Sequence, residues 1–412
     1  MKSDRIYATN QASIVPRRLL LGFMLTTLIA PVTILNKILF VILMVWTLNL
    51  IAKNRKPGIR LYIPAFTIVM IYFYGLLISM FGRSDGVLAS QFFLATFVLV
   101  LIHFIENFRI DMDQAAESCG KVMLAVTFVY LLVTFNQDLP YAAAVFNWLN
   151  EINSSATSER DFLEGGLTLT LALGTVPFLF VPWCIVCVRL IHSRRIADFL
   201  WLMFYGLAIG LSGARGLVVV ALMFLIAALF WLTSFRTRII FFLILVAVLF
   251  IVVPLIFNET RIFSSEEISN ATKIGHLNSF VDQLNIYNIF FGNGLGSYYF
   301  SSGKDDWLAH TELTPVDLAR YVGIPLACVV YILMLFPFST VACYKGQNFL
   351  FVFGFFLFLV LSITNPTLIN SYGMLVVIWY WAKLGRSFKR NFSKSTPKSL
   401  NKNFHPLSGL QG

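Results

Sequence analysis

Two short stretches of the chain carry side chains that could act on hydroxyl and phosphate groups. In the first, His310 and Glu312 stand just before a predicted helix. Thr314 can cap that helix, Pro315 fits its first position and Asp317 its third. A neutral histidine or a carboxylate can take a proton from a hydroxyl group there, beside a helix N-terminus able to hold an anion. The alternative is an exposed loop histidine and a solvated glutamate.

The second stretch is the turn Leu211-Ser-Gly-Ala-Arg-Gly216, whose small residues allow a tight reversal between two apolar runs. Arg215 starts the following predicted helix, where the dipole already presents about half a positive charge. Such an arginine needs an anionic partner, and a phosphate matches the guanidinium fork. The alternative is an arginine that extends to the membrane interface or pairs with a loop carboxylate.

Further charged residues near these stretches are candidates for substrate binding. Lys273 lies one turn from His276 in a segment of amphipathic helix character, and it is either a second phosphate contact or an ordinary exposed lysine. Arg320 and Asp317, at the start of the next apolar run, complete the set. No third ligand accompanies the pair Asp305-Asp306, so we expect no metal site and no cofactor.

A glycine-rich stretch, Phe291-Gly-Asn-Gly-Leu-Gly-Ser297, resembles a phosphate loop only superficially, because no predicted strand precedes it. Two interpretations remain. Its backbone amides could form an anion nest, or it could be a tight turn that shapes the surrounding loop. We expect the tight turn.

The composition indicates that these residues are held by membrane helices. The chain of 412 residues is 58% hydrophobic and only 12% charged, and its mean hydropathy is +0.78. A soluble domain needs more polar cover. The net charge of +11 comes from short basic clusters between apolar runs, which is the positive-inside pattern of membrane proteins rather than a nucleic-acid-binding face.

Twelve apolar runs are long enough to suggest transmembrane helices, so we predict an all-α polytopic membrane protein. The runs are Arg18–Leu35, Ile38–Ala52, Leu61–Met80, Val87–Glu106, Lys121–Phe135, Gly165–Ile191, Ala197–Leu211, Arg215–Ser234, Ile239–Phe257, Asp317–Phe338, Phe349–Ile363 and Leu368–Ala382. They form one predicted bundle over residues 1–382.

Placing the N-terminus in the cytoplasm puts every basic cluster on the cytoplasmic side, together with the C-terminus. The two long loops, about 136–164 and 258–316, then lie outside. The basic, Ser-rich tail, residues 383–412, is expected to be a disordered arm near anionic lipid. Arg215, Lys273, His310 and Glu312 therefore share the outer face, and we expect a multi-pass protein of a bacterial inner membrane.

Three features in this order resemble the O-antigen polymerase and ligase superfamily. They are the Ser-Gly-Ala-Arg-Gly turn, the long outer loop with Gly-Asn-Gly-Leu-Gly-Ser, and His-Thr-Glu followed by Asp317 and Tyr321-Val-Gly-Ile. The resemblance covers about Ser212 to Ile324 in detail, and the rest only in helix count and topology.

The resemblance implies a metal-independent glycosyltransferase. Its donor would be a glycan on undecaprenyl pyrophosphate, and its acceptor the hydroxyl of another lipid-linked repeat unit on the periplasmic face. Arg215 matches the arginine of the short turn, which holds the pyrophosphate, and His310 matches the loop histidine of ligases. Glu312 is the second candidate base. A chain-length regulator protein is an expected partner.

Two features separate this chain from the ligases. Lys273 stands where ligases have a second loop arginine, and His310-Thr311 replaces their His-Asn pair. The resemblance therefore favours a polymerase of repeat-unit glycans, with a ligase to lipid A-core as the nearest alternative. A transporter of lipid-linked oligosaccharides is the alternative from another class, but transporters place charge at the membrane midplane.

Overall fold

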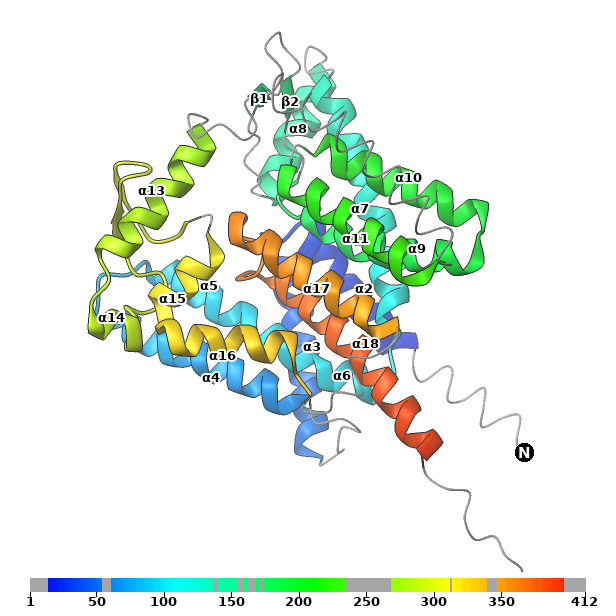
Figure 1. Ribbon diagram of the computed structural model, residues 1–412, viewed down its shortest axis with the longest axis horizontal. Coiled ribbons are helices and arrows are strands. Elements are labelled where there is room, and N and C mark those ends of the chain that lie inside the picture. Colours follow the sequence, from blue (N-terminus) through cyan, green and yellow to red (C-terminus); the bar gives the residue numbers. More distant parts are fainter. Residues whose placement is uncertain are drawn as a thin grey trace, which may run out of the picture.

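The described residues form helices and two small antiparallel strand pairs. A computed structural model describes residues 14–53, 61–135, 140–153, 159–161, 168–170, 173–212, 214–233, 268–311, 313–338 and 347–395 (Figure 1). The predicted span Ile239–Phe257 lies outside these residues.

The described elements before the first hairpin are all helices. Its helices are α2 (Ile14–Ile29), α3 (Ile34–Ala52), α4 (Tyr62–Ser79), α5 (Gly86–Thr96), the 3-10 helix η1 (Phe97–Val100), α6 (Leu101–Asn107), α7 (Met112–Phe135) and α8 (Pro140–Asn153). Strands β1 (Glu159–Asp161) and β2 (Thr168–Thr170) pair antiparallel, with Arg160 opposite Leu169.

The second half contains the second hairpin between two groups of helices. The helices are η2 (Val176–Leu179), α9 (Phe180–Ser193), α10 (Ile196–Leu211), α11 (Arg215–Leu232), α13 (Ile268–Asp282), α14 (Ile286–Phe291), α15 (Thr314–Val322), α16 (Ile324–Leu335), α17 (Gln347–Thr364) and α18 (Ser371–Ser395). Strands β3 (Tyr299–Ser301) and β4 (Asp306–Leu308) pair antiparallel, with Phe300 opposite Trp307.

Five helical stretches among the described residues are long and apolar enough to cross a membrane: Ile34–Ala52, Tyr62–Ser79, Gly86–Asn107, Val176–Ser193 and Arg215–Leu232. Ile196–Leu211, Ile324–Leu335 and Asn348–Thr364 are shorter apolar helices. The prediction of an all-α membrane protein agrees with this pattern. The count of twelve spans and the orientation of the termini stay predictions.

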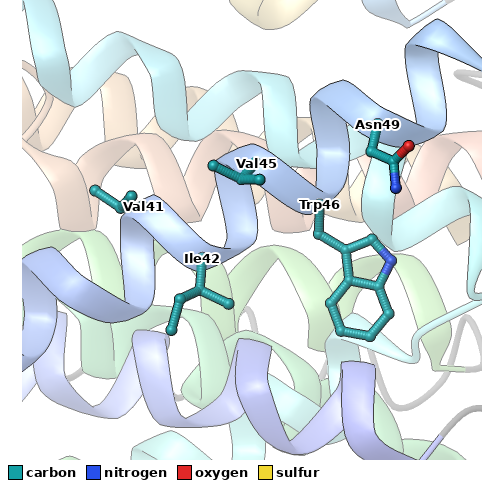
Figure 2. Close-up of a pocket in the computed structure, with 5 residues that line it drawn as sticks. All are labelled: Val41, Ile42, Val45, Trp46 and Asn49. Carbon is teal, nitrogen blue, oxygen red and sulfur yellow. The ribbon is translucent and has the colours of Figure 1, made fainter.

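The outer surface of the bundle is apolar, as expected for a protein that lipid surrounds. Helix α3 shows this most clearly, because Val41, Ile42 and Val45 are exposed along one of its faces. Together with Trp46 and Asn49 they line a shallow hollow on that helix (Figure 2). None of the predicted site residues lies there.

The middle of the bundle is occupied by α18, whose residues from Tyr372 to Ala382 are all buried. A helix that is hydrophobic on every side requires such a central place. Two of its aromatic residues also satisfy carbonyl groups that the end of α16 leaves open. Tyr380 Oη donates to Leu335 O at 2.7 Å, and Trp381 Nε1 donates to Met334 O at 2.9 Å.

Three helix ends meet at one end of the bundle, which we call the site end. The hydroxyl of Thr314, the first residue of α15, donates to the carbonyl of Asn365 just after α17, at 3.2 Å. Gly216, at the start of α11, packs so closely on α17 that an added Cβ would lie 3.2 Å from Leu361 and 3.5 Å from Asn365 Nδ2. The starts of α11 and α15 therefore share an end with the end of α17.

The glycine-rich stretch joins the end of α4 to the same site end. Gly292, Gly294 and Gly296 have φ values of +73°, +90° and +64°, which side chains rarely adopt. Its amides donate inside the protein, Asn293 N to Arg320 O at 2.7 Å and Gly294 N to Tyr321 O at 3.0 Å. The expected tight turn is confirmed, and because these amides are used internally the anion-nest alternative is wrong.

The opposite end of the bundle is held by ion pairs. Lys383 and Arg386 of α18 pair with Asp113 and Asp111 at the start of α7, the second pair at 2.9 Å. Arg189 near the end of α9 pairs at 2.6 Å and 2.7 Å with carboxylates of α7 and α10. In Figure 1, α18 runs to the lower right, away from α13, α14 and α15 at the left.

Several predicted boundaries are wrong for physical reasons. The predicted span Asp317–Phe338 is two helices, α15 and α16, separated at Gly323, whose φ is +82°. Thr314 is not a cap but the first helical residue. The tail is helical from Lys383 up to Ser395, because its first basic residues pair with α7.

The long loops also have more structure than a loop prediction implies. The first, 136–164, contains α8 and β1, and the second, 258–316, contains α13, α14, β3 and β4. Because their backbone groups are paired within these elements, the loops can hold side chains in fixed positions.

We expect Gly294→Ala to lower the stability of the protein by about 2 kcal/mol or more. An alanine at φ +90° is strained, and its Cβ would lie 2.4 Å from Ser79 N. Gly86→Ala is the matched control, since nothing lies within 4 Å of a Cβ there, and it should melt at or slightly above the wild-type temperature. Thermal unfolding of the purified protein in detergent compares the two. Equal melting of Gly294→Ala and wild type would show that the turn is not tight.

Candidate active site

The candidate site is built on the loop between β4 and α15. His310 and Thr311 follow the strand, and Asp317 lies in the first turn of the helix. The Nδ1 atom of His310 lies 2.8 Å from Oδ2 of Asp317, and the backbone N–H of Thr311 donates to the same oxygen at 2.8 Å. The Thr311 hydroxyl in turn accepts from Leu313 N at 3.1 Å. The aspartate thus organises the loop that carries the histidine.

The contact between His310 and Asp317 is electrostatic more than a linear hydrogen bond, because an Nδ1–H bond would not point at the oxygen. It becomes an ion pair when the imidazole is protonated. The ring packs edge-on against Phe92 of α5, with 5.3 Å between the ring centroids. The histidine side chain is still 28% exposed, so a substrate can reach it.

Arg320 holds the other oxygen of the aspartate. Its Nη2 donates to Asp317 Oδ1 at 2.9 Å and to Ala309 O at 2.8 Å, and its Nη1 donates to Leu308 O at 3.3 Å and to Ser297 O. The guanidinium lies 4.2 Å from the centre of the Tyr299 ring. One buried side chain therefore joins α15, the end of β4 and the glycine-rich stretch Phe291–Ser297, which we call the glycine turn.

The charge on Asp317 follows from these contacts. Complete burial alone would raise the pKa of its carboxyl, but the contact with His310 and the charge of Arg320 outweigh it and hold the pKa below its usual range. The carboxylate is therefore ionised at neutral pH. Its contribution to stability is present above about pH 4 and is lost as the pH falls through the lowered pKa.

Arg215 lies at the same end of the bundle as this loop. It is half-buried at the start of α11. The adjacent Gly216 packs on Asn365, and Asn365 accepts the hydrogen bond of Thr314, three residues before Asp317. The starts of α11 and α15 are therefore neighbours through Asn365.

Lys273 is placed by packing between α13 and the second hairpin, and it is half-buried. On the same helix, His276 Nδ1 contacts Ser301 Oγ, and Ser279 Oγ lies 2.9 Å from Ser302 Oγ. These contacts fasten α13 to β3 and hence to the loop of His310. Glu312 lies outside the described residues.

The structure also brings in residues that the sequence did not indicate. Asn365 carries a usable signal, because an Asn-Pro pair marks a turn, and Pro366 follows it. Tyr299 carries none, since nothing in its sequence context indicates that it stacks on Arg320. Burial raises the pKa of Tyr299 to about 12, so it stays neutral beside the guanidinium.

The arrangement contains a partly exposed imidazole in contact with a buried carboxylate, and an arginine at the same end of the bundle. Such a set can accept a proton from a hydroxyl group and place positive charge beside an anion. Searches against protein-family models and against curated proteins found no match to this chain. The chemistry of the site therefore carries the functional assignment.

We expect Asp317→Asn to destabilise the protein by about 3 kcal/mol, because it leaves the buried charge of Arg320 without its counter-ion. Asp305→Asn is the matched control, since it removes the same charge from an exposed position on the turn of the second hairpin. Thermal unfolding in detergent measures both. A melting temperature that Asp317→Asn leaves unchanged would contradict the assigned role of the pair.

Proposed function

We propose that this protein is a polymerase of repeat-unit glycans of the O-antigen type, acting in the bacterial inner membrane. The donor is a glycan on undecaprenyl pyrophosphate, and the acceptor is a hydroxyl of another lipid-linked repeat unit. The observation that carries the proposal is the contact between His310 and the buried Asp317, at the end of the bundle that also contains Arg215.

The proposed reaction needs a base and a site for a leaving pyrophosphate. The acceptor oxygen attacks the anomeric carbon, the bond from that carbon to the pyrophosphate oxygen breaks, and the acceptor proton passes to Nε2 of His310. Pyrophosphate leaves as an anion, so it needs positive charge more than a proton. Arg215 and Lys273 supply that charge, and Glu312 is the second candidate base.

Asp317 and Arg320 act in this proposal by positioning other groups. Both were predicted to bind substrate, but Asp317 is fully buried and Arg320 is 4% exposed, and their polar atoms contact the chain itself. Asp317 orients the imidazole and stabilises the cation that forms when it accepts the proton. The contact between Asp317 and His310 can tighten when a substrate enters.

The position of the site supports a reaction at one membrane face. The proposed catalytic residues lie at the site end, whereas Lys383, Arg386 and Arg189 lie at the opposite end. With that opposite end in the cytoplasm, the site faces the periplasm, where a chain-length regulator protein could also bind. A transporter would instead place its charged groups near the midplane of the bundle.

We expect Arg215→Ala to reduce the synthesis of long glycan chains at least about tenfold, because the leaving pyrophosphate loses a charge-assisted contact. Arg215→Lys should keep part of the activity, since it retains the charge but not the planar fork. Arg83→Ala is the matched control, because Arg83 is an exposed arginine at the same end of the bundle. A gel of cell-surface lipopolysaccharide reads the outcome at equal protein level. Normal ladders from Arg215→Ala would contradict the proposed pyrophosphate contact.

The same gel separates the alternatives when the gene is deleted. Loss of a polymerase leaves lipid A-core bearing single repeat units, whereas loss of a ligase leaves core without any. A deletion strain that keeps its long ladder contradicts both assignments. Flux of lipid-linked glycan across liposomes without elongation would instead support a transporter.

A further inference from the structure

The stretch from Phe291 to Leu295 lies beside the last turns of α4, whereas Gly296 and Ser297 lie beside Asp85 and Ser84, which follow that helix. Tyr74 Oη donates to Phe291 O at 3.1 Å, and Leu295 N donates to Gly75 O at 2.9 Å. Helix α4 continues to Ser79. At about 1.5 Å per residue, these contacts lie roughly 6 Å inside the end of a helix that can cross the membrane.

Non-helical backbone at membrane depth requires hydrogen-bond partners inside the protein. The glycine turn has them. Asn293 and Gly294 donate to carbonyls of α15, Leu295 donates to Gly75 of α4, and Asp85 N donates to Gly296 O. The close fit leaves no room for side chains, because an added Cβ at Gly292 would lie 2.5 Å from Tyr321 O. The turn therefore meets the condition for a place inside an apolar layer.

The side of α14 that faces away from the protein is apolar. Ile286 is 79% exposed, Tyr287 61% and Phe290 55%, and no charged residue occurs from Leu284 to Ser297. The neighbouring asparagine amides are used locally, since Asn285 Oδ1 caps α14 and Asn288 Nδ2 donates to Gln283 O at 3.3 Å. A water-exposed helix would place polar groups on this face.

This apolar face continues the lipid-facing surface of α4. Met70 and Leu77 lie one turn to either side of Tyr74 on the same helix face, and both are exposed. Tyr74 contacts Phe291, so the exposed strip of α4 passes directly onto α14. Tyrosine and phenylalanine are residue types that suit the interface between lipid and water.

We propose that residues 286–295 form a re-entrant segment that enters the outer-facing layer of the membrane, with Tyr287 and Phe290 against lipid. The segment fixes the depth of the buried pair of Arg320 and Asp317, because its backbone donates to α15. The loop of His310 is thereby held at the membrane surface, where a lipid-linked molecule presents its headgroup. The place of this segment in the membrane is independent of the proposed glycosyl transfer.

Spin labels test this placement in the full-length protein. Nitroxide is attached to Tyr287→Cys or Phe290→Cys, with Cys328 and Cys343 replaced by alanine, in vesicles of phosphatidylcholine and phosphatidylglycerol. Two control positions calibrate the measurement. Phe66→Cys reports the exposed face of α4 nearer the start of that helix, and Asp305→Cys reports the exposed turn of the second hairpin.

The expected result is a ratio of oxygen to nickel-chelate collision rates at Tyr287 and Phe290 that exceeds the Asp305 ratio at least about fivefold and approaches that of Phe66. Two results would overturn the proposal. Ratios equal to that of Asp305 would place α14 in water, and labels shielded from both reagents would show a protein surface, such as a second copy, covering it. Because the measurement needs no activity, either failure leaves the proposed reaction standing.

Discussion

The buried pair of Arg320 and Asp317 is the interaction on which the site end depends. Both side chains lie out of contact with solvent, where an unpaired charge is very costly. The carboxylate occupies one guanidinium nitrogen, backbone carbonyls of three separate residues take further donors, and Tyr299 covers one face. These partners come from α15 itself, from the glycine turn, and from the second hairpin with the residue that follows it. Satisfying one charge therefore fixes the glycine turn, the second hairpin and α15 relative to one another.

This constraint also fixes the loop that carries His310, the proposed catalytic residue. The apolar layer of a bilayer supplies no water, so the backbone N–H and C=O groups of a turn inside that layer must find partners within the protein. The glycine turn meets this condition by packing on α4 and α15, and Asp317 organises the neighbouring loop of His310. The imidazole alone among these groups remains partly open to the outside. Asp317 and Arg320 thus hold the structure together, while the neighbouring His310 stays accessible to a substrate.

The apolar runs predicted the helices well where lipid faces them. Helix α4, Tyr62–Ser79, differs from the predicted run Leu61–Met80 by one residue at each end. The prediction was wrong where charges pair inside the protein. Helix α7 begins at Met112, not at Lys121, because its first turns carry carboxylates that pair with Lys383 and Arg189. Hydropathy cannot detect such turns, since their polar groups are neutralised by residues far away in the chain.

In the candidate site, too, some contacts could be predicted from the sequence and others could not. The spacing of Asp317 and Arg320 already places both on one face of a helix, so their contact could have been anticipated. The contact of His310 with Asp317 could not, because it depends on a loop whose path is set by the hairpin and by Arg320. Asn365 was missed for a similar reason. Its role arises only when the ends of α11, α15 and α17 meet.

The most direct measurement of the central claim uses purified protein in liposomes supplied with a single lipid-linked repeat unit. Mass spectrometry of the lipid-linked products follows the glycan length. The account predicts a series of longer glycans and released undecaprenyl pyrophosphate from the wild-type protein, and loss of that series from a folded His310→Ala variant. A series that His310→Ala leaves undiminished would contradict the account, as would a wild-type protein that produces no elongated glycan.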